Sequence, residues 1–186
     1  MGRAYKNFWS LNTDEAVVTG ILRDCTPKNV EVLIPLNAQM KGIDLILMNI
    51  ESKKIISIQV KGSRAFEPRK SETEKYGEGS PGWFFFPKEV IERSTADYFI
   101  FLVYVIEQNY QSGRRLIAPH TITIPINNLK KLIKENKSTH GDGRYSFKFW
   151  INPKEKKSFD FRDSNYYVSE YLDKKGFVKL NALINK

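Results

Sequence analysis

The nearly continuous apolar run at residues 96–107, ADYFIFLVYVIE, constrains the fold of this chain more than any other feature. The run is rich in aromatic and β-branched residues, which is typical of a β-strand that is buried on both faces. Helical patterns lie on both sides of the strand-forming segments. The sequence therefore predicts an α/β fold in which a mixed β-sheet is flanked by helices.

Apolar spacing and turn residues predict the other elements. Residues 13–25 have the apolar spacing of a helix, with Asn12 as N-cap and Glu15 at the capping-box position. A second helix is expected at residues 165–176, where Gly176 would form the C-cap. Further expected elements are strands at residues 30–36, 121–126 and 145–151, a β-hairpin at residues 42–63 and a helix at residues 127–136.

The segment at residues 64–82, RAFEPRKSETEKYGEGSPG, is polar and contains several Gly and Pro residues. It is predicted to be an irregular and mobile loop. Neither an internal repeat nor a linker is recognisable, so residues 1–186 are expected to form a single domain. The single cysteine, Cys25, cannot form an internal disulfide and fits a reducing compartment.

The charge balance favours a polyanionic partner. Thirty Lys and Arg residues against 21 Asp and Glu residues give a formal net charge of +9, and such an excess favours nucleic acid first of all. No apolar run reaches the roughly 18 residues needed to cross a bilayer, and residues 1–15 contain no apolar signal segment. We therefore expect a cytoplasmic protein that binds nucleic acid and no membrane.

The hairpin at residues 42–63 carries three polar side chains that a purely structural hairpin would not need: Asp44, Gln59 and Lys61. If the turn closes at residues 51–52, Asp44 lies opposite Gln59. If it closes one residue later, Asp44 lies opposite Lys61. Because directly opposed residues point to the same side of a sheet, both registers bring the three groups together.

This combination of groups suits one kind of chemistry. A carboxylate beside an amide oxygen supplies the hard oxygen ligands that a hydrated Mg²⁺ prefers. A neighbouring ammonium can orient an attacking water or stabilise the charge that develops on a phosphate. The alternative is a half-exposed ion pair between Asp44 and Lys61, with Gln59 solvated beside it.

Residues 42–44, GID, and residues 59–61, QVK, resemble the motif of the PD-(D/E)XK nuclease superfamily, in which an Asp on one strand precedes (D/E/Q)-x-Lys on the next. Glu15 matches the Glu on the N-terminal helix of that family, and the element order over residues 12–110 is similar to the family core. The resemblance implies a restriction-endonuclease-like fold and Mg²⁺-dependent cleavage of DNA, with Mn²⁺ able to substitute.

The resemblance also implies roles for individual residues. Asp44 would be the central metal ligand, Gln59 a second ligand and the carbonyl oxygen of Val60 a third. Lys61 would act on the attacking water, and Glu15 would contribute as a ligand or through a water. These assignments make Lys61, Asp44, Gln59 and Glu15 the expected catalytic residues.

The sequence departs from the family pattern at two positions. Ile43 stands in place of the Pro of the motif, and Gln59 stands in place of the usual acidic residue, which makes this chain a Gln-x-Lys variant. The second change removes one negative charge from the metal site, so weaker metal affinity is expected.

The resulting hypothesis is a metal-dependent endonuclease that hydrolyses phosphodiester bonds in double-stranded DNA, acting as a homodimer if it cuts both strands. Two alternatives stay open. One is a catalytically inactive nuclease-fold module that binds nucleic acid. The other is a basic interaction protein that binds acidic proteins or lipids.

Other residues are weaker candidates for function. Arg64 and Lys70 are expected to contact DNA phosphates because they closely follow the strand that carries Lys61. The aromatic run at residues 83–86 could stack on bases, although core packing is the simpler interpretation. His120 and His140 have no Cys or acidic partner at zinc spacing, so we expect no metal site there.

Overall fold

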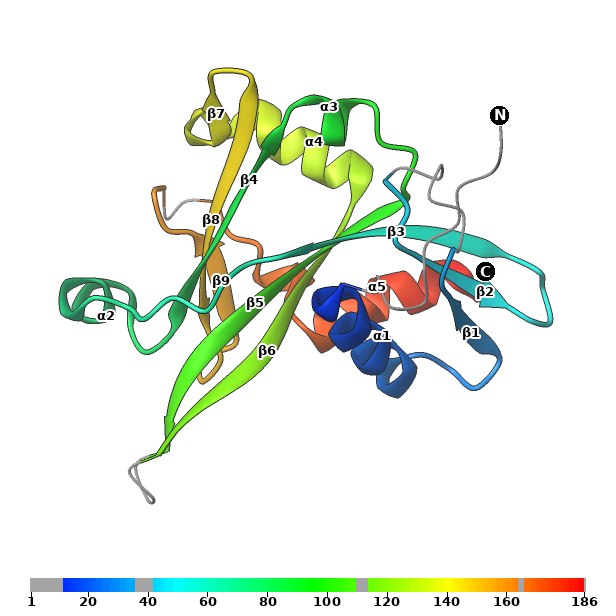
Figure 1. Ribbon diagram of the computed structural model, residues 1–186, viewed down its shortest axis with the longest axis horizontal. Helices are drawn as coiled ribbons and strands as arrows, with labels where there is room; N and C mark the ends of the chain where they lie inside the picture. Colours follow the sequence, from blue (N-terminus) through cyan, green and yellow to red (C-terminus); the bar gives the residue numbers. More distant parts are fainter. Residues whose placement is uncertain (1–11, 36–41, 110–113, 164–165, 186) are drawn as a thin grey trace.

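A computed structural model of the chain describes residues 12–35, 42–109, 114–163 and 166–185. Within these ranges the strands form a five-stranded sheet and a four-stranded sheet, with helices packed around them (Figure 1). The expectation of a mixed α/β structure is therefore confirmed. No helix in the described ranges is long and apolar enough to cross a membrane.

The five-stranded sheet has the order β1-β2-β3-β5-β6. Its central strand, β3, pairs in parallel with β5, and the other neighbouring strands are antiparallel, so the sheet is mixed. The bounds of its strands are β1 Val30–Leu33, β2 Leu45–Asn49, β3 Ile55–Gly62, β5 Tyr98–Asn109 and β6 Arg114–Pro125.

Strand β5 is buried on both faces, as its apolar run predicts. Tyr98, Ile100 and Leu102 belong to one core cluster, whereas Phe99 and Phe101 belong to the other. This alternation follows from the two-residue period of a strand, and it places one hydrophobic core on each side of the five-stranded sheet.

Two helices cover one face of the five-stranded sheet. Helix α1, Thr13–Cys25, begins as predicted after Asn12, whose side chain accepts a hydrogen bond from the Asp14 N–H. Helix α5, Lys174–Ile184, packs beside it. Apolar residues from both helices meet β2, β3 and β5 in one cluster, which includes Val18, Leu22, Val60, Phe177 and Leu180.

The four-stranded sheet and two further helices cover the other face. Its strands are β4 Ser80–Pro87, β7 His140–Gly141, β8 Arg144–Asn152 and β9 Lys157–Asp160. The helices are α3 Glu89–Glu92 and α4 Ile126–Glu135, and two 3-10 helices span Lys137–Thr139 and Ser169–Tyr171. Aromatic rings fill the space between the two sheets, with Phe84 of β4 lying 4.9 Å from Phe101 of β5, centre to centre.

The prediction of one irregular loop at residues 64–82 is wrong in two places. Helix α2 spans Lys70–Tyr76, and β4 begins at Ser80. The helix starts in a capping box in which the Glu72 carboxylate accepts a hydrogen bond from the Arg69 N–H at 2.8 Å. The mobility of this segment stays a prediction.

The prediction of a helix at residues 165–176 is also wrong. A short 3-10 helix and a residue with positive φ, Asp173, precede α5, and Gly176 lies inside the first turn of α5 instead of ending a helix. Gly176 is required there because a Cβ atom would collide with the carbonyl oxygen of Tyr171. The glycine therefore marks a close approach of two backbones.

Candidate active site

The register of the β2–β3 hairpin decides which polar residues face each other. The β2–β3 ladder runs from Met48–Ile55 to Leu45–Ile58, and this register, continued by one position, would set Asp44 opposite Gln59. This is the register that closes the turn at residues 51–52, the first of the two expected. The alternative pairing of Asp44 with Lys61 is excluded.

Asp44 lies where the two strands separate. Its backbone N–H donates to the carbonyl oxygen of Ile58 at 2.8 Å, and its Oδ2 accepts a hydrogen bond from the N–H of Val60 at 2.7 Å. The carboxylate thus takes the place of a backbone acceptor on β2. Because the N–H and C=O of one strand residue point to the same neighbouring strand, the carbonyl oxygen of Val60 also faces the Asp44 side. We call this end of the hairpin, with Asp44, Gln59 and Val60, the open end.

Gln59 is a buried amide at the open end. Its side chain is 5% exposed, and its Oε1 accepts no hydrogen bond from any described residue. The side chain lies near Gly42, whose φ of 85° gives the chain its turn into β2. A buried acceptor without a partner costs about 1–3 kcal/mol, and a cation beside it would offset that cost.

Lys61 lies two residues after Gln59, so the two side chains leave the same face of β3. Their partners on β5 are Phe99 and Phe101, which belong to the core between the two sheets. Lys61 is half-buried and lines a cleft together with Arg64. The structure therefore brings Lys61 and Arg64 to the same end of β3.

Glu15 reaches the sheet from α1. It is buried and shares one stripe of the helix with Val18 and Leu22, which pack in one cluster with Val60. Val60 lies on one face of β3, and Gln59 and Lys61 lie on the opposite face. The first turn of α1 therefore packs against the face of β3 that carries Val60, not the face that carries Gln59 and Lys61. The catalytic role of Glu15 stays a prediction.

Sequence reasoning did not single out Asp14, which fixes the position of the α1 start. Its carboxylate lies over Gly62, where a Cβ atom would overlap it, and its Oδ1 accepts a hydrogen bond from the Tyr104 hydroxyl at 2.9 Å. Burial and this hydrogen bond raise the pKa of Tyr104 to about 12. The contact joins residues 90 positions apart, so no local signal in the sequence could reveal it.

Lys70 is not brought to the open end. It lies on α2, pairs with Glu74 at 4.0 Å and is almost fully exposed. Figure 1 shows α2 at the opposite side of the molecule from β2. Its predicted contact with a phosphate would therefore have to be made at a distance from Asp44.

The donor set at the open end fits a hydrated Mg²⁺. It comprises the carboxylate of Asp44, the amide oxygen of Gln59 and the carbonyl oxygen of Val60, and Mg²⁺ commonly keeps several waters beside one or two protein ligands. Within the described ranges, no three or more His, Cys, Asp or Glu side chains form a group that could hold a metal ion.

No protein-family model, curated protein or solved structure matches this chain. The assignment of function therefore depends on the geometry of the molecule.

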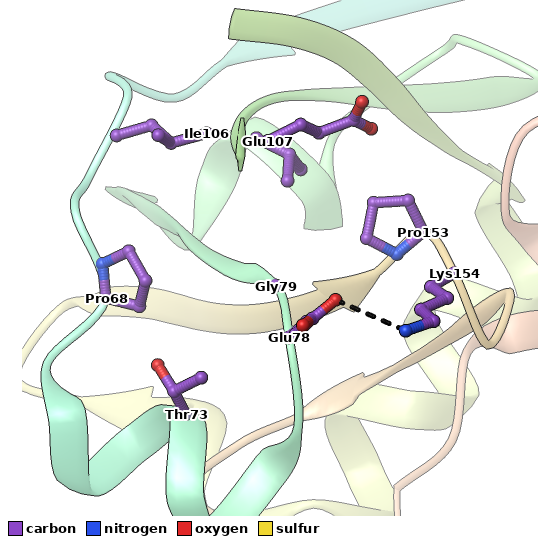
Figure 2. Close-up of a pocket in the computed structure, with 9 residues that line it drawn as sticks. Pro68, Thr73, Glu78, Gly79, Ile106, Glu107, Pro153 and Lys154 are labelled. Carbon is purple, nitrogen blue, oxygen red and sulfur yellow. Dashed lines mark ion pairs between the residues drawn. The ribbon is translucent and has the colours of Figure 1, made fainter. Parts of the chain in front are cut away.

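A cleft of about 550 Å³ lies away from the predicted site residues, between α2 and the ends of β5 and β8 (Figure 2). Its lining includes Glu78, Glu107 and Lys154, and the Lys154 ammonium lies 3.7 Å from the Glu78 carboxylate. A lining with charges of both signs gives no consistent attraction for a polyanion.

His120 borders this region and forms a bridge between two carboxylates. Its Nδ1 lies 2.9 Å from Asp173 Oδ2, and its Nε2 lies 3.2 Å from Glu107 Oε1. Burial lowers the pKa of His120, but the hydrogen bonds and charges of the two carboxylates outweigh burial and raise it above its usual 6.5. Since both ring nitrogens are engaged, the bridge acts as a structural tie.

Proposed function

We propose that this chain is a metal-dependent endonuclease that hydrolyses phosphodiester bonds in DNA. The observation that carries the proposal is the open end of the hairpin. There the Asp44 carboxylate, a buried amide oxygen with no partner among the described residues and a neighbouring lysine occur together. The net charge of +9 supports attraction to a nucleic-acid backbone.

The order of elements supports the same proposal. Helix α1, strand β1 and the β2–β3 hairpin are followed by a crossover that contains α2, β4 and α3, and then by β5 in parallel with β3. This order agrees with the core that the sequence motif implies. A restriction-endonuclease-like fold is therefore part of the proposal.

The residues at the open end and the neighbouring Lys61 would divide the chemistry between them. Asp44, Gln59 and the Val60 carbonyl would hold Mg²⁺, with the Val60 N–H orienting the carboxylate. Bound Mg²⁺ would polarise the phosphate and lower the pKa of a water ligand. The ammonium of Lys61 would orient the attacking water and stabilise the negative charge of the pentavalent transition state.

Plasmid cleavage tests the proposal. The wild-type chain is expected to nick supercoiled DNA in Mg²⁺ or Mn²⁺. Asp44→Asn keeps an oxygen that can accept the Val60 hydrogen bond but removes the charge, and Lys61→Ala removes the ammonium. Each should lower the rate by about 100-fold or more.

Matched controls come from exposed positions of the same residue types. Asp24→Ala and Lys28→Ala should leave the rate unchanged, because both side chains are exposed beyond the buried part of α1. A metal-stimulated activity that survives both Asp44→Asn and Lys61→Ala would refute the site assignment. A Mn²⁺-dependent rise in Tm that Asp44→Asn abolishes would support metal binding independently of cleavage.

A second candidate is a nuclease-fold module that binds nucleic acid without cutting it. Gln59 favours it, because an amide supplies less charge to a metal ion than a carboxylate does. Binding that weakens steeply with salt, together with intact plasmid in Mg²⁺ and Mn²⁺, would select this candidate.

A further inference from the structure

A second cleft, of about 490 Å³, opens beside Lys61. It lies between the end of β3 and the strand β4, with Val90 of α3 on its border. This volume is in the range of ligand-binding clefts. Lys61 and Arg64 are its charged lining residues, and no Asp or Glu lines it within the described part of the chain.

Aromatic rings form the other wall of this cleft. The alternation of β4 sends Phe84 and Phe86 into the core and leaves Trp83 and Phe85 on the outer face. Trp83 stacks on Phe66 with ring centres 4.8 Å apart and an interplanar angle of 26°. Core packing, the simpler expectation for residues 83–86, is therefore correct for only two of the four rings.

Phe85 is 54% exposed although it lies within a strand. Its partner on β8 is Ser146, whose small side chain cannot cover the ring. On β8, Lys148 pairs with Trp83, and its ammonium lies 5.3 Å from the centre of the Trp83 ring. An exposed aromatic surface bordered by positive charges is typical of a binding site.

This combination fits a nucleotide whose base is not paired. The exposed ring of Phe85 can stack on a base, and Arg64 and Lys148 can bind the flanking phosphates. The bases of an uninterrupted duplex are already stacked on each other, so they cannot reach these rings unless they are flipped out. We infer that the cleft receives an unpaired base of the substrate, which makes single-stranded DNA the preferred substrate class. This inference rests on the proposed function, because it places the base beside Lys61.

Binding measured without divalent metal tests the inference. The probe is a fluorescein-labelled oligothymidylate of about 12 nucleotides, compared by anisotropy with a duplex of equal length. The wild-type chain should bind the single strand more tightly. Phe85→Ala should weaken that binding by about 5- to 100-fold, and Phe85→Trp should retain it.

Tyr167→Ala is the matched control, because Tyr167 is an aromatic residue that is 62% exposed elsewhere on the surface. It should leave the affinity unchanged. A preference for duplex, or an affinity for the single strand that Phe85→Ala does not change, would overturn the inference. An equal loss for both probes would also overturn it.

The outcome is distinguishable from a failure of the proposed function. Asp44→Asn should bind the oligothymidylate normally while failing to cut DNA. If the chain cuts DNA under no condition but its binding to the single strand depends on Phe85, the nuclease proposal fails and the cleft is still supported as the site that receives the base. If the chain cuts plasmid and Phe85→Ala binds normally, the nuclease proposal stands and the base site fails.

Discussion

Two buried amide side chains lie at the two ends of the β2–β3 hairpin, and their surroundings differ. At the turn, Asn49 is 3% exposed, and its Oδ1 accepts hydrogen bonds from the N–H groups of Glu51 and Ser52 at 3.0 Å. Its Nδ2 donates to the carbonyl oxygen of Ile184 at 3.3 Å. At the open end, Gln59 is 5% exposed, and its Oε1 has no donor among the described residues.

The two amides have the same chemistry and nearly the same burial, so the difference between them lies in their partners. Folded proteins provide partners for most buried polar groups, and an exception calls for an explanation. The amide of Asn49 ties the turn to the end of α5, which is a structural role. The oxygen of Gln59 has no such partner among the described residues, and under the proposed function a bound cation would offset the cost of burying it.

The largest effect on the free energy of unfolding is expected from a substitution of Asn49, at the turn of the hairpin. Asn49→Leu preserves approximate size but deprives the turn N–H groups and the Ile184 carbonyl of their partner. Unfolding in urea should show a loss of about 2–3 kcal/mol. A loss below about 0.5 kcal/mol would break the comparison, because Asn49 would then contribute no more than an unsatisfied amide.

A second carboxylate at the open end sharpens the comparison. Gln59→Glu places a buried charge beside Asp44, and without divalent metal it should lower the free energy of unfolding by about 1–2 kcal/mol. Mg²⁺ should restore the stability and bind about tenfold more tightly than to the wild-type chain. Thermal unfolding with and without Mg²⁺ measures both effects. A Tm that does not change when Mg²⁺ is added would contradict a metal site here.

His120 extends the comparison to a titratable side chain whose polar atoms both have partners. The pKa of His120 is raised in the folded state, so its stabilisation is present below pH 6.5 and is lost as the pH rises through the higher folded value. Asp173→Asn removes one carboxylate charge and should cost about 1 kcal/mol at acidic pH, with less effect at alkaline pH. Urea midpoints across the pH range test this, and a cost that grows with pH would contradict it.

The smallest effect on stability is expected from Gln59→Met. The substitution removes an oxygen that has no partner among the described residues and keeps the length of the side chain. Without metal the chain should therefore be unchanged or more stable by up to about 1 kcal/mol. It should nevertheless abolish the Mg²⁺-dependent rise in Tm. A large destabilisation would show that the Gln59 amide is structural, as the Asn49 amide is.

The sequence was informative wherever the deciding interactions are local. Asn12 marks the start of α1, and the aromatic and β-branched run at residues 96–107 identifies the doubly buried strand β5. The hairpin and its polar residues were also recognisable, because the two-residue alternation assigns Gln59 and Lys61 to one face. Two registers remained open, since both place apolar residues on the same side.

The sequence failed where the deciding contact joins distant segments. Gly176 suggests the end of a helix, but it lies inside α5 because the Tyr171 carbonyl approaches its backbone. The polar composition of residues 64–82 conceals helix α2, which an Arg69–Glu72 capping box initiates. The four-stranded sheet was not predicted as a separate layer, because its long strands β4 and β8 pair although β5, β6 and α4 lie between them in the sequence.

The sequence by itself determined which residues could act, since only side-chain chemistry and local periodicity are needed to propose Asp44, Gln59 and Lys61. The tertiary structure decided how they are arranged. It chose the register in which Leu45 pairs with Ile58, bonded the Asp44 carboxylate to the Val60 N–H and left the Gln59 oxygen without a donor among the described residues. It also exposed Phe85 beside Arg64. Burial and hydrogen-bond satisfaction depend on which distant segments pack together, and a local pattern does not contain that information.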